Sequence, residues 1–325
     1  MQLSLQLSIP ALNQPIVYTD HILLLGSCFT EHIAGKLSHH KFRVLQNPNG
    51  ILFNPLSVAN ALNSYLERRT YTEADFFQLN GTWNSWQHHS QCSHTDLAEA
   101  ITGINNTQQQ ASDFVKKAGW VMITLGSAFQ YYLKEGNIPV ANNHRAPAQW
   151  FEKRLLPVEE IVATMTYALQ QLLHQNPQAR ILFTISPVRH IRDGVVDNNR
   201  SKARLIEAVH TLCEQLPACH YFPSYELVMD ILRDYRFYDI DFVHPNYLAT
   251  EYVWQEFRKA CIDPTIFPIM EAVKDIMTAR AHRPRFPGTE SHQKFIERYA
   301  LKVHELMEQH PFLDLQEELT YFTLK

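Results

Sequence analysis

The chain alternates between short apolar runs and longer segments in which apolar residues recur every three or four positions. The runs are typical of strands buried on both faces of a parallel sheet, and the longer spacing is typical of amphipathic helices. The predicted strands lie at residues 22–25, 41–46, 120–125, 180–185 and 219–222. The predicted helices lie at residues 29–37, 56–69, 96–117, 157–174 and 199–216.

This alternation predicts an α/β fold, because βαβ units with right-handed crossovers place a parallel sheet between two layers of helices. Beyond Pro264 the pattern becomes purely helical and more charged. We therefore expect an α/β domain over residues 1–263 and, packed on the same domain, a helical extension over residues 264–325.

Two stretches interrupt the alternation. Residues 71–93 are the least regular part of the chain and are rich in aromatic residues. A long insertion of this kind is usually functional or a lid, so we expect it to form a wall over the active site. Residues 130–151 have the composition of a hairpin followed by a loop.

Composition limits the class of protein. With 325 residues, 45% hydrophobic and 19% charged, the chain can bury the core of one large domain or two small ones. A net charge of -4 without a long run of one sign predicts neither a nucleic-acid nor a membrane partner. The first residues lack a signal-peptide pattern and no apolar run reaches membrane-spanning length, so we expect a cytoplasmic protein. The five cysteines form no CxxC pair, which predicts reduced thiols.

The first predicted strand and helix meet at residues that suit a nucleophile. Gly26 permits a tight turn, and Ser27 then lies at the end of a strand beside the free N–H groups of a helix terminus. Taken alone, a serine here is more often a helix N-cap. Cys28 is an alternative nucleophile, because a helix N-terminus favours the thiolate. It points about a quarter-turn away from Ser27, however, and we expect it to pack in the core.

A second chemical pattern lies near residue 240. Asp241 and His244 are three residues apart, so a single turn can bring the carboxylate to the imidazole and fix its tautomer. An isolated pair of this kind is more often a solvated aspartate and a capping histidine. Its position favours a catalytic role, because it follows the last predicted strand, at the sheet edge that carries Ser27.

Several motifs occur in an order that resembles a known family. They are GSCF, NGILFNP, TLGSAF, SPVRH, YFPSYELVMD, RDYRFY and DFVHP. These motifs extend from about residue 26 to about residue 257. On their basis the chain is identified as a member of the GSCFA family of SGNH-type hydrolases. The resemblance implies a three-layer α/β/α sandwich with a flavodoxin-like parallel sheet. It also implies that Ser27 is the nucleophile, His244 the general base and Asp241 its orienting acid.

The implied oxyanion hole departs from the superfamily pattern. SGNH hydrolases use the serine amide, a glycine amide of the second motif and an asparagine side chain of a GxND third motif. Gly50 matches the glycine, whereas the third motif begins at Gly126 and reads GSAF, without the asparagine. One lost donor commonly costs about 10²–10³ in rate, so we expect a replacement. The candidates are Asn54, Asn142 and His144.

Four residues within or just after the aromatic insertion include the elements of a metal site: His88, His89, Cys92 and His94. Their spacing matches no closed zinc pattern, so we expect a partly buried loop and no bound metal. His89 is a candidate for lining the substrate pocket.

Arg189 and His190 follow the predicted strand at residues 180–185 and therefore lie at the active edge. They are candidates for binding an anionic acyl or sugar group. An ion pair of Arg189 with Asp193 or Asp230 is an equally good prediction.

These features predict a serine-dependent esterase or acyl hydrolase, or an O-acyltransferase, that forms an acyl-enzyme from a small ester. Superfamily analogy makes an O-acetylated carbohydrate one candidate substrate. The chemistry needs no metal or organic cofactor. The alternative is a non-catalytic module that binds carbohydrate or another ligand on the same scaffold.

Overall fold

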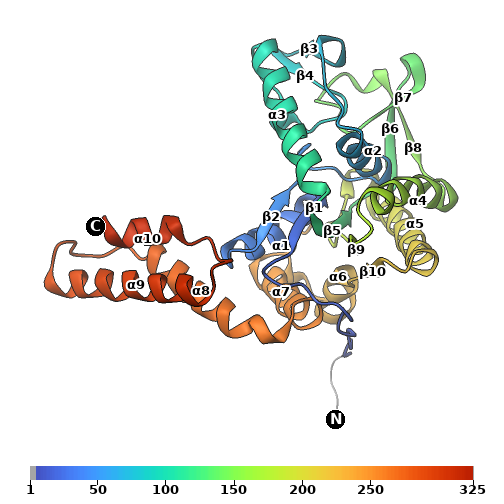
Figure 1. Ribbon diagram of the computed structural model, residues 1–325. Helices are drawn as coiled ribbons and strands as arrows, with labels where there is room; N and C mark the ends of the chain where they lie inside the picture. Colours follow the sequence, from blue (N-terminus) through green and yellow to red (C-terminus); the bar gives the residue numbers. More distant parts are fainter. Residues whose placement is uncertain (1–4, 325) are drawn as a thin grey trace.

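The computed structural model describes residues 5–324, and its centre is a five-stranded parallel sheet (Figure 1). The spatial order of its strands is β2–β1–β5–β9–β10. Counted along the chain, these strands follow the flavodoxin-like order, so the predicted fold class is confirmed. They are β1 (His21–Gly26), β2 (Arg43–Gln46), β5 (Ala118–Leu125), β9 (Arg180–Ile185) and β10 (Cys219–Tyr221).

Helices cover both faces of the sheet, because successive strand residues point to opposite sides. Ile22 and Leu24 belong to the core on one face, and Leu23 and Leu25 to the core on the other. The first face is covered by α1 (Cys28–His39) and α7 (Tyr247–Cys261). Two short elements come before α7 in the chain: α6 (Ser224–Glu226) and a π-helical turn (Leu227–Leu232). The second face is covered by α2 (Pro55–Leu66), α3 (Leu97–Val115), α4 (Val158–Gln175) and α5 (Gly194–Gln215).

The strand order reverses direction between β1 and β5, which leaves a crevice outside their carboxyl ends. The two strands approach closely there. A Cβ atom on Gly26 would lie 2.2 Å from the carbonyl oxygen of Thr124, and Gly26 has a φ of +138°. Only glycine therefore fits where β1 ends.

A second, antiparallel sheet of order β7–β6–β8 follows the end of β5. Its strands are β6 (Phe129–Leu133), β7 (Ile138–Val140) and β8 (Phe151–Leu155). The hairpin predicted within residues 130–151 is confirmed by β6 and β7. β8 is absent from the prediction, because the three middle residues of its sequence, FEKRL, are charged.

The aromatic insertion packs against this second sheet. It contains a short hairpin of β3 (Phe77–Leu79) and β4 (Thr82–Asn84). The Phe77 and Trp86 rings stack with their centroids 3.6 Å apart, and the Trp86 carbonyl accepts a hydrogen bond from the Ala141 amide at 2.7 Å. The insertion therefore braces β7 from outside.

The C-terminal part of the chain is a helical extension that projects to one side of the sandwich (Figure 1). It consists of α8 (Phe267–Ala281), α9 (Glu290–Gln309) and α10 (Gln316–Thr323). Its base shares the apolar core of α1 and α7, and Lys41 Nζ lies 2.8 Å from the buried carboxylate of Glu318. Within residues 5–324, no helix is long and apolar enough to cross a membrane.

Candidate active site

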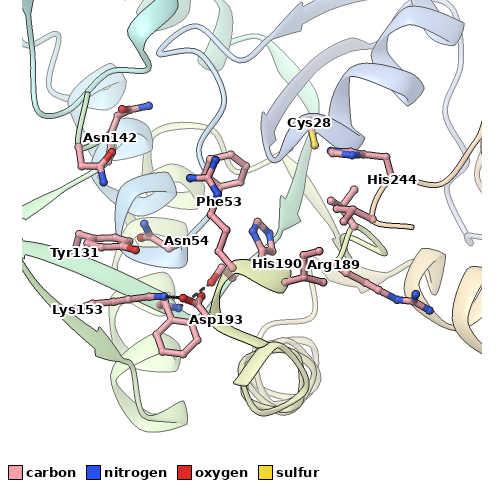
Figure 2. A pocket seen from close by; sticks show the side chains of 18 of the residues that line it. Cys28, Phe53, Asn54, Tyr131, Asn142, Lys153, Arg189, His190, Asp193 and His244 are labelled. Carbon is pink, nitrogen blue, oxygen red and sulfur yellow. Dashed lines mark hydrogen bonds and ion pairs between the residues drawn. The ribbon is translucent and has the colours of Figure 1, made fainter. Parts of the chain in front are cut away.

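A cavity of about 580 Å³ opens beside the carboxyl ends of β1, β5 and β9. Its walls come from the second sheet and from the loop before α7 (Figure 2). Residues 71–93 contribute none of its lining, so the prediction that they form the wall is wrong. The lining residues are Cys28, Phe53, Asn54, Ser127, Phe129, Tyr131, Val140, Ala141, Asn142, Asn143, Lys153, Val188, Arg189, His190, Ile191, Arg192, Asp193, Asp241, Val243 and His244.

Asp241 and His244 form the expected contact in the loop before α7. Asp241 Oδ2 accepts a hydrogen bond from His244 Nδ1 at 2.6 Å, and Oδ1 accepts the amides of Val243 and His244 at 2.9 and 3.0 Å. The bond from the His244 ring, followed by the two amides, lowers the pKa of Asp241 to about 2. The carboxylate is therefore ionised at neutral pH and holds the Nδ1 proton, which leaves Nε2 of His244 as the proton acceptor.

Arg189 supports this loop. Phe242 has a left-handed backbone (φ 57°), which is rare for a bulky residue and needs support from its surroundings. The Arg189 guanidinium lies 4.2 Å from the centroid of the Tyr238 ring and donates a hydrogen bond to the Phe242 carbonyl at 3.3 Å. Asp193 pairs with Lys153 instead, and among the described residues Arg189 forms an ion pair with neither Asp193 nor Asp230. Arg189 therefore shapes the loop.

His190 lines the cavity, and its ring meets the Phe53 ring edge-on with centroids 5.5 Å apart. Burial, and next the ammonium of Lys202, lower the pKa of His190 to about 4. The imidazole is therefore neutral at neutral pH. It offers hydrogen bonds to a ligand and not a fixed positive charge.

The two nucleophile candidates lie where β1 turns into α1. Ser27 is the N-cap residue, yet its side chain makes no capping bond, is 1% exposed, and has no hydrogen-bond partner for Oγ within residues 5–324. The expected hydrogen bond from Ser27 to His244 is therefore not formed. Cys28 lines the cavity, and Figure 2 shows its sulfur facing the His244 ring. The orientations of the two side chains are thus the reverse of the expected ones.

The backbone around Ser27 explains this orientation. The Ser27 amide donates to the Thr124 carbonyl at 3.1 Å, which ties Ser27 to β5. Its Cβ lies 3.3 Å from the place that a Cβ on Gly126 would occupy, so the side chain points beneath the end of β5. The rotation of about 100° per residue in a helix then carries Cys28 to the open side.

Opposing influences act on the Cys28 thiol. Burial is the largest and raises its pKa above the ordinary value, and Glu31 acts in the same direction. The amides of Cys28 and Phe29 and the ammonium of Lys202 act in the opposite direction. The thiol is therefore protonated at neutral pH and needs a base before it can attack.

The expected oxyanion donors are only partly available. The Gly50 amide donates to the Asn47 carbonyl at 2.7 Å, and the Gly126 amide to the Phe53 carbonyl at 2.8 Å, so neither is free to bind an oxyanion. Asn54 is the N-cap of α2, where its Oδ1 accepts the Ser57 amide at 2.9 Å. Because Asn54 also lines the cavity, its Nδ2 is available to a ligand.

The other predicted pocket residues divide between lining and support. Asn142 lines the cavity, and its Oδ1 accepts the His144 amide at 2.8 Å. His144 is buried in the wall, where Nε2 lies 2.9 Å from the Ser85 carbonyl. His89 packs behind Gly50, since a Cβ on Gly50 would lie 2.4 Å from its own. Neither His144 nor His89 belongs to the cavity lining.

The histidines within and just after the aromatic insertion have separate surroundings. His88 Nδ1 lies 3.0 Å from Ser85 Oγ, whereas His94 Nδ1 accepts the Asp96 amide at 3.1 Å. In the part of the chain that the structure describes, no three His, Cys, Asp or Glu side chains are arranged to hold a metal ion.

Two lysines of the site are absent from the sequence-based prediction. Lys202 is 1% exposed, and its Nζ donates to the carbonyls of Gly126 and Ser186 at 2.7 and 2.6 Å, beneath the cavity. Its spacing from Leu205, at the position of the buried helix face, is a signal that identifies it. Lys153 had no such signal, because β8 was not predicted.

Two family models match the chain. The GSCFA family model matches residues 21–257, which include every residue of the cavity lining. The model described as GSCFA domain protein, C-terminal domain, matches residues 273–325, which include most of α8 and all of α9 and α10. No curated protein matches the chain.

Proposed function

The chain belongs to the GSCFA family, and we propose that it is an acyl-transfer enzyme of the SGNH hydrolase type that acts on a small ester. Cys28 is the nucleophile, His244 the general base, and Asp241 orients His244. The observation that carries this proposal is the 2.6 Å hydrogen bond between Asp241 and His244 beside a cavity that Cys28 also lines. Nucleophile, base and orienting acid are the three parts that covalent acyl transfer requires.

In the first half of the reaction, His244 Nε2 accepts the thiol proton while Cys28 Sγ attacks the acyl carbonyl carbon. A C–S bond forms, and the π electrons of the carbonyl move to its oxygen, which becomes an oxyanion. The intermediate then collapses, the C–O bond to the alcohol breaks, and the imidazolium protonates the leaving oxygen. Asp241, which stays ionised, stabilises the imidazolium between these steps.

The second half repeats these steps in reverse. His244 removes a proton from water or from an acceptor alcohol, whose oxygen attacks the thioester carbonyl. The C–S bond breaks, and the Cys28 thiolate regains a proton from His244. Water gives the free acid and an esterase, whereas an alcohol gives a new ester and an O-acyltransferase.

The oxyanion forms close to the start of α1. The amides of Cys28 and Phe29 lie in the first helical turn, which the Ser27 side chain does not cap. These N–H groups and the positive end of the helix dipole favour negative charge. Asn54 Nδ2 is a further donor, from the start of α2.

The character of the cavity supports a small ester with a polar alcohol part. Its lining combines apolar side chains such as Val188 and Val243 with the amides of Asn142 and Asn143 and the hydroxyl of Tyr131. Such a mixture suits a short acyl group joined to an alcohol rich in hydroxyl groups. An O-acetylated carbohydrate, which superfamily analogy favours, has both parts.

The test is acylation of the protein by p-nitrophenyl acetate, followed by release of p-nitrophenol and by the mass of the intact protein. We expect a single acetyl adduct that maps to Cys28 and is lost in Cys28→Ala. Ser27→Ala and the control Cys213→Ala, a half-buried thiol on α5, should keep it.

Each other outcome identifies a different error. Loss of the adduct in Ser27→Ala, with Cys28→Ala unaffected, would make the serine the nucleophile, as the family resemblance implies. A folded protein that binds an acetylated sugar but takes up no acetyl group would be a binding module and would overturn the enzymatic proposal.

A further inference from the structure

The His190 ring is held in place by its neighbours, but one of its nitrogens is unused. Its backbone amide donates to Asn198 Oδ1 at 2.9 Å, and the ring lies edge-on to Phe53. Nε2 is buried and has no hydrogen-bond partner within residues 5–324. A buried polar atom without a partner destabilises the folded protein, because it has given up its hydrogen bond to water. A ligand that supplies the missing hydrogen bond would remove this cost.

His190 Nε2 lies close to the residue that precedes the nucleophile. A Cβ on Gly126 would lie 3.2 Å from His190 Nε2 and 3.3 Å from Ser27 Cβ. Because Gly126 has no Cβ, no side chain at this position separates Nε2 from Ser27, which Cys28 follows in the chain. Both Cys28 and His190 line the same cavity (Figure 2).

The two cavity histidines differ in their suitability as a base. The Nδ1 proton of His244 is held by the Asp241 carboxylate, whereas no carboxylate contacts the His190 ring in the described part of the chain. Burial and Lys202 keep His190 uncharged, and Asp193, a carboxylate that acts against them, is paired with Lys153. An imidazole whose pKa is lowered to about 4 is a weak base, but its neutral N–H is a good hydrogen-bond donor to a developing oxyanion.

We propose that His190 donates its Nε2 hydrogen to the oxyanion that forms when Cys28 attacks the substrate. The imidazole thereby takes the place of the asparagine side chain that the GSAF sequence at Gly126 lacks. This role rests on the acyl-transfer function proposed above. It makes His190 a catalytic residue that acts only once the carbonyl carbon becomes tetrahedral.

The test separates the donor from the shape of the ring. His190→Phe keeps a planar ring beside Phe53 but removes the donor, and His190→Gln restores an N–H group. With p-nitrophenyl acetate we expect kcat to fall by about 10²–10³ in His190→Phe, with KM changed little, and about a tenth of the wild-type kcat to return in His190→Gln. The control is His220→Phe, another half-buried histidine beside an aromatic ring, Trp120, at 5.8 Å, and it should keep the wild-type kcat.

Alkylation of Cys28 by iodoacetamide supplies a second readout, because it needs the thiolate but forms no oxyanion. We expect its rate at Cys28 to be the same in His190→Phe as in the wild type. An unchanged kcat in His190→Phe, or an equal fall in kcat and in alkylation, would overturn this proposal alone. A wild-type protein that takes up no acetyl group at Cys28 would overturn the acyl-transfer function, and this role with it.

Discussion

The two sides of the cavity differ in what controls their reactive groups: burial on one side and hydrogen bonds on the other. The floor, which comprises Cys28, His190 and Lys202, is largely buried, and burial is the main influence on the pKa of each of these groups. The opposite side is the loop of Asp241 and His244, whose side chains are 44% and 49% exposed and whose order comes from hydrogen bonds. Changes in and beneath the floor should therefore alter stability as well as activity, whereas changes in the loop should alter activity alone.

The largest expected effect is on the loop side. His244→Ala should reduce kcat for p-nitrophenyl acetate by about 10⁴, because the base that activates Cys28 is lost. The free energy of unfolding should change by less than about 0.5 kcal/mol, since the side chain is half exposed. Urea unfolding measured beside the kinetics checks both, and a large fall in stability would show that the loop is part of the structural core.

The strand ends beneath the floor should respond in the opposite sense. Gly26→Ala places a Cβ 2.2 Å from the Thr124 carbonyl in a backbone with a φ of +138°, so we expect a loss of about 2–4 kcal/mol in the free energy of unfolding. Gly35→Ala is the matched control, because a Cβ there meets nothing within 4 Å and lies within α1. It should stabilise the protein by about 0.5–1 kcal/mol. Equal stabilities of the two variants would contradict the close approach of β1 and β5.

Lys202 gives the floor a pH dependence above neutral pH. Burial lowers the pKa of Lys202 from 10.5 to about 7 in the folded protein, so between these values the unfolded chain binds more protons. Its contribution to the free energy of unfolding should therefore rise with pH above about 7, by at most about 1.4 kcal/mol per pH unit.

Urea unfolding at several pH values from neutral upward checks this slope. The difference between the wild type and Lys202→Met isolates the contribution, because the other titrating groups are common to both proteins. Parallel pH profiles would show that the ammonium is charged in the folded floor throughout.

The smallest effect should come from the support of the loop. Arg189→Leu removes both the contact with Tyr238 and the hydrogen bond to the Phe242 carbonyl. We expect kcat to fall roughly tenfold, because His244 is held less accurately, with stability nearly unchanged. Arg200→Leu, at an exposed arginine on α5, is the control and should leave kcat as it is. A loss in Arg189→Leu equal to that in His244→Ala would mean that Arg189 contacts the substrate.

The same division separates what the sequence predicts from what it does not. The sheet, the main helices and the contact of Asp241 with His244 follow from local spacing: apolar runs, helical periodicity and a separation of three residues. The direction of the Ser27 and Cys28 side chains depends on how β1 meets β5, which is a tertiary contact without a local signal. The sequence therefore predicts a hydrogen bond between residues of one turn, but it does not predict which of two adjacent side chains is buried by a tertiary contact.

The cavity wall shows the same limit. The aromatic composition of residues 71–93 predicts a cavity wall there, yet β6, β7 and β8 form the wall. β8 carries three charged residues. Its Lys153 belongs there because it pairs with Asp193 and lies 4.1 Å from the centroid of the Phe129 ring. Neither partner is close to Lys153 in the sequence, so periodicity could not reveal the strand.

The ion pair between Lys41 and Glu318 has a consequence for the helix that carries Cys28. Lys41 lies two residues beyond the last residue of α1, so the C-terminal extension anchors one end of this helix, while the bond from the Ser27 amide to Thr124 anchors the other. These two contacts restrain the helix from tilting, so the N–H groups of its first turn keep their direction. Charge that develops in front of them meets dipoles already in position, and little reorganisation is needed as the reaction proceeds.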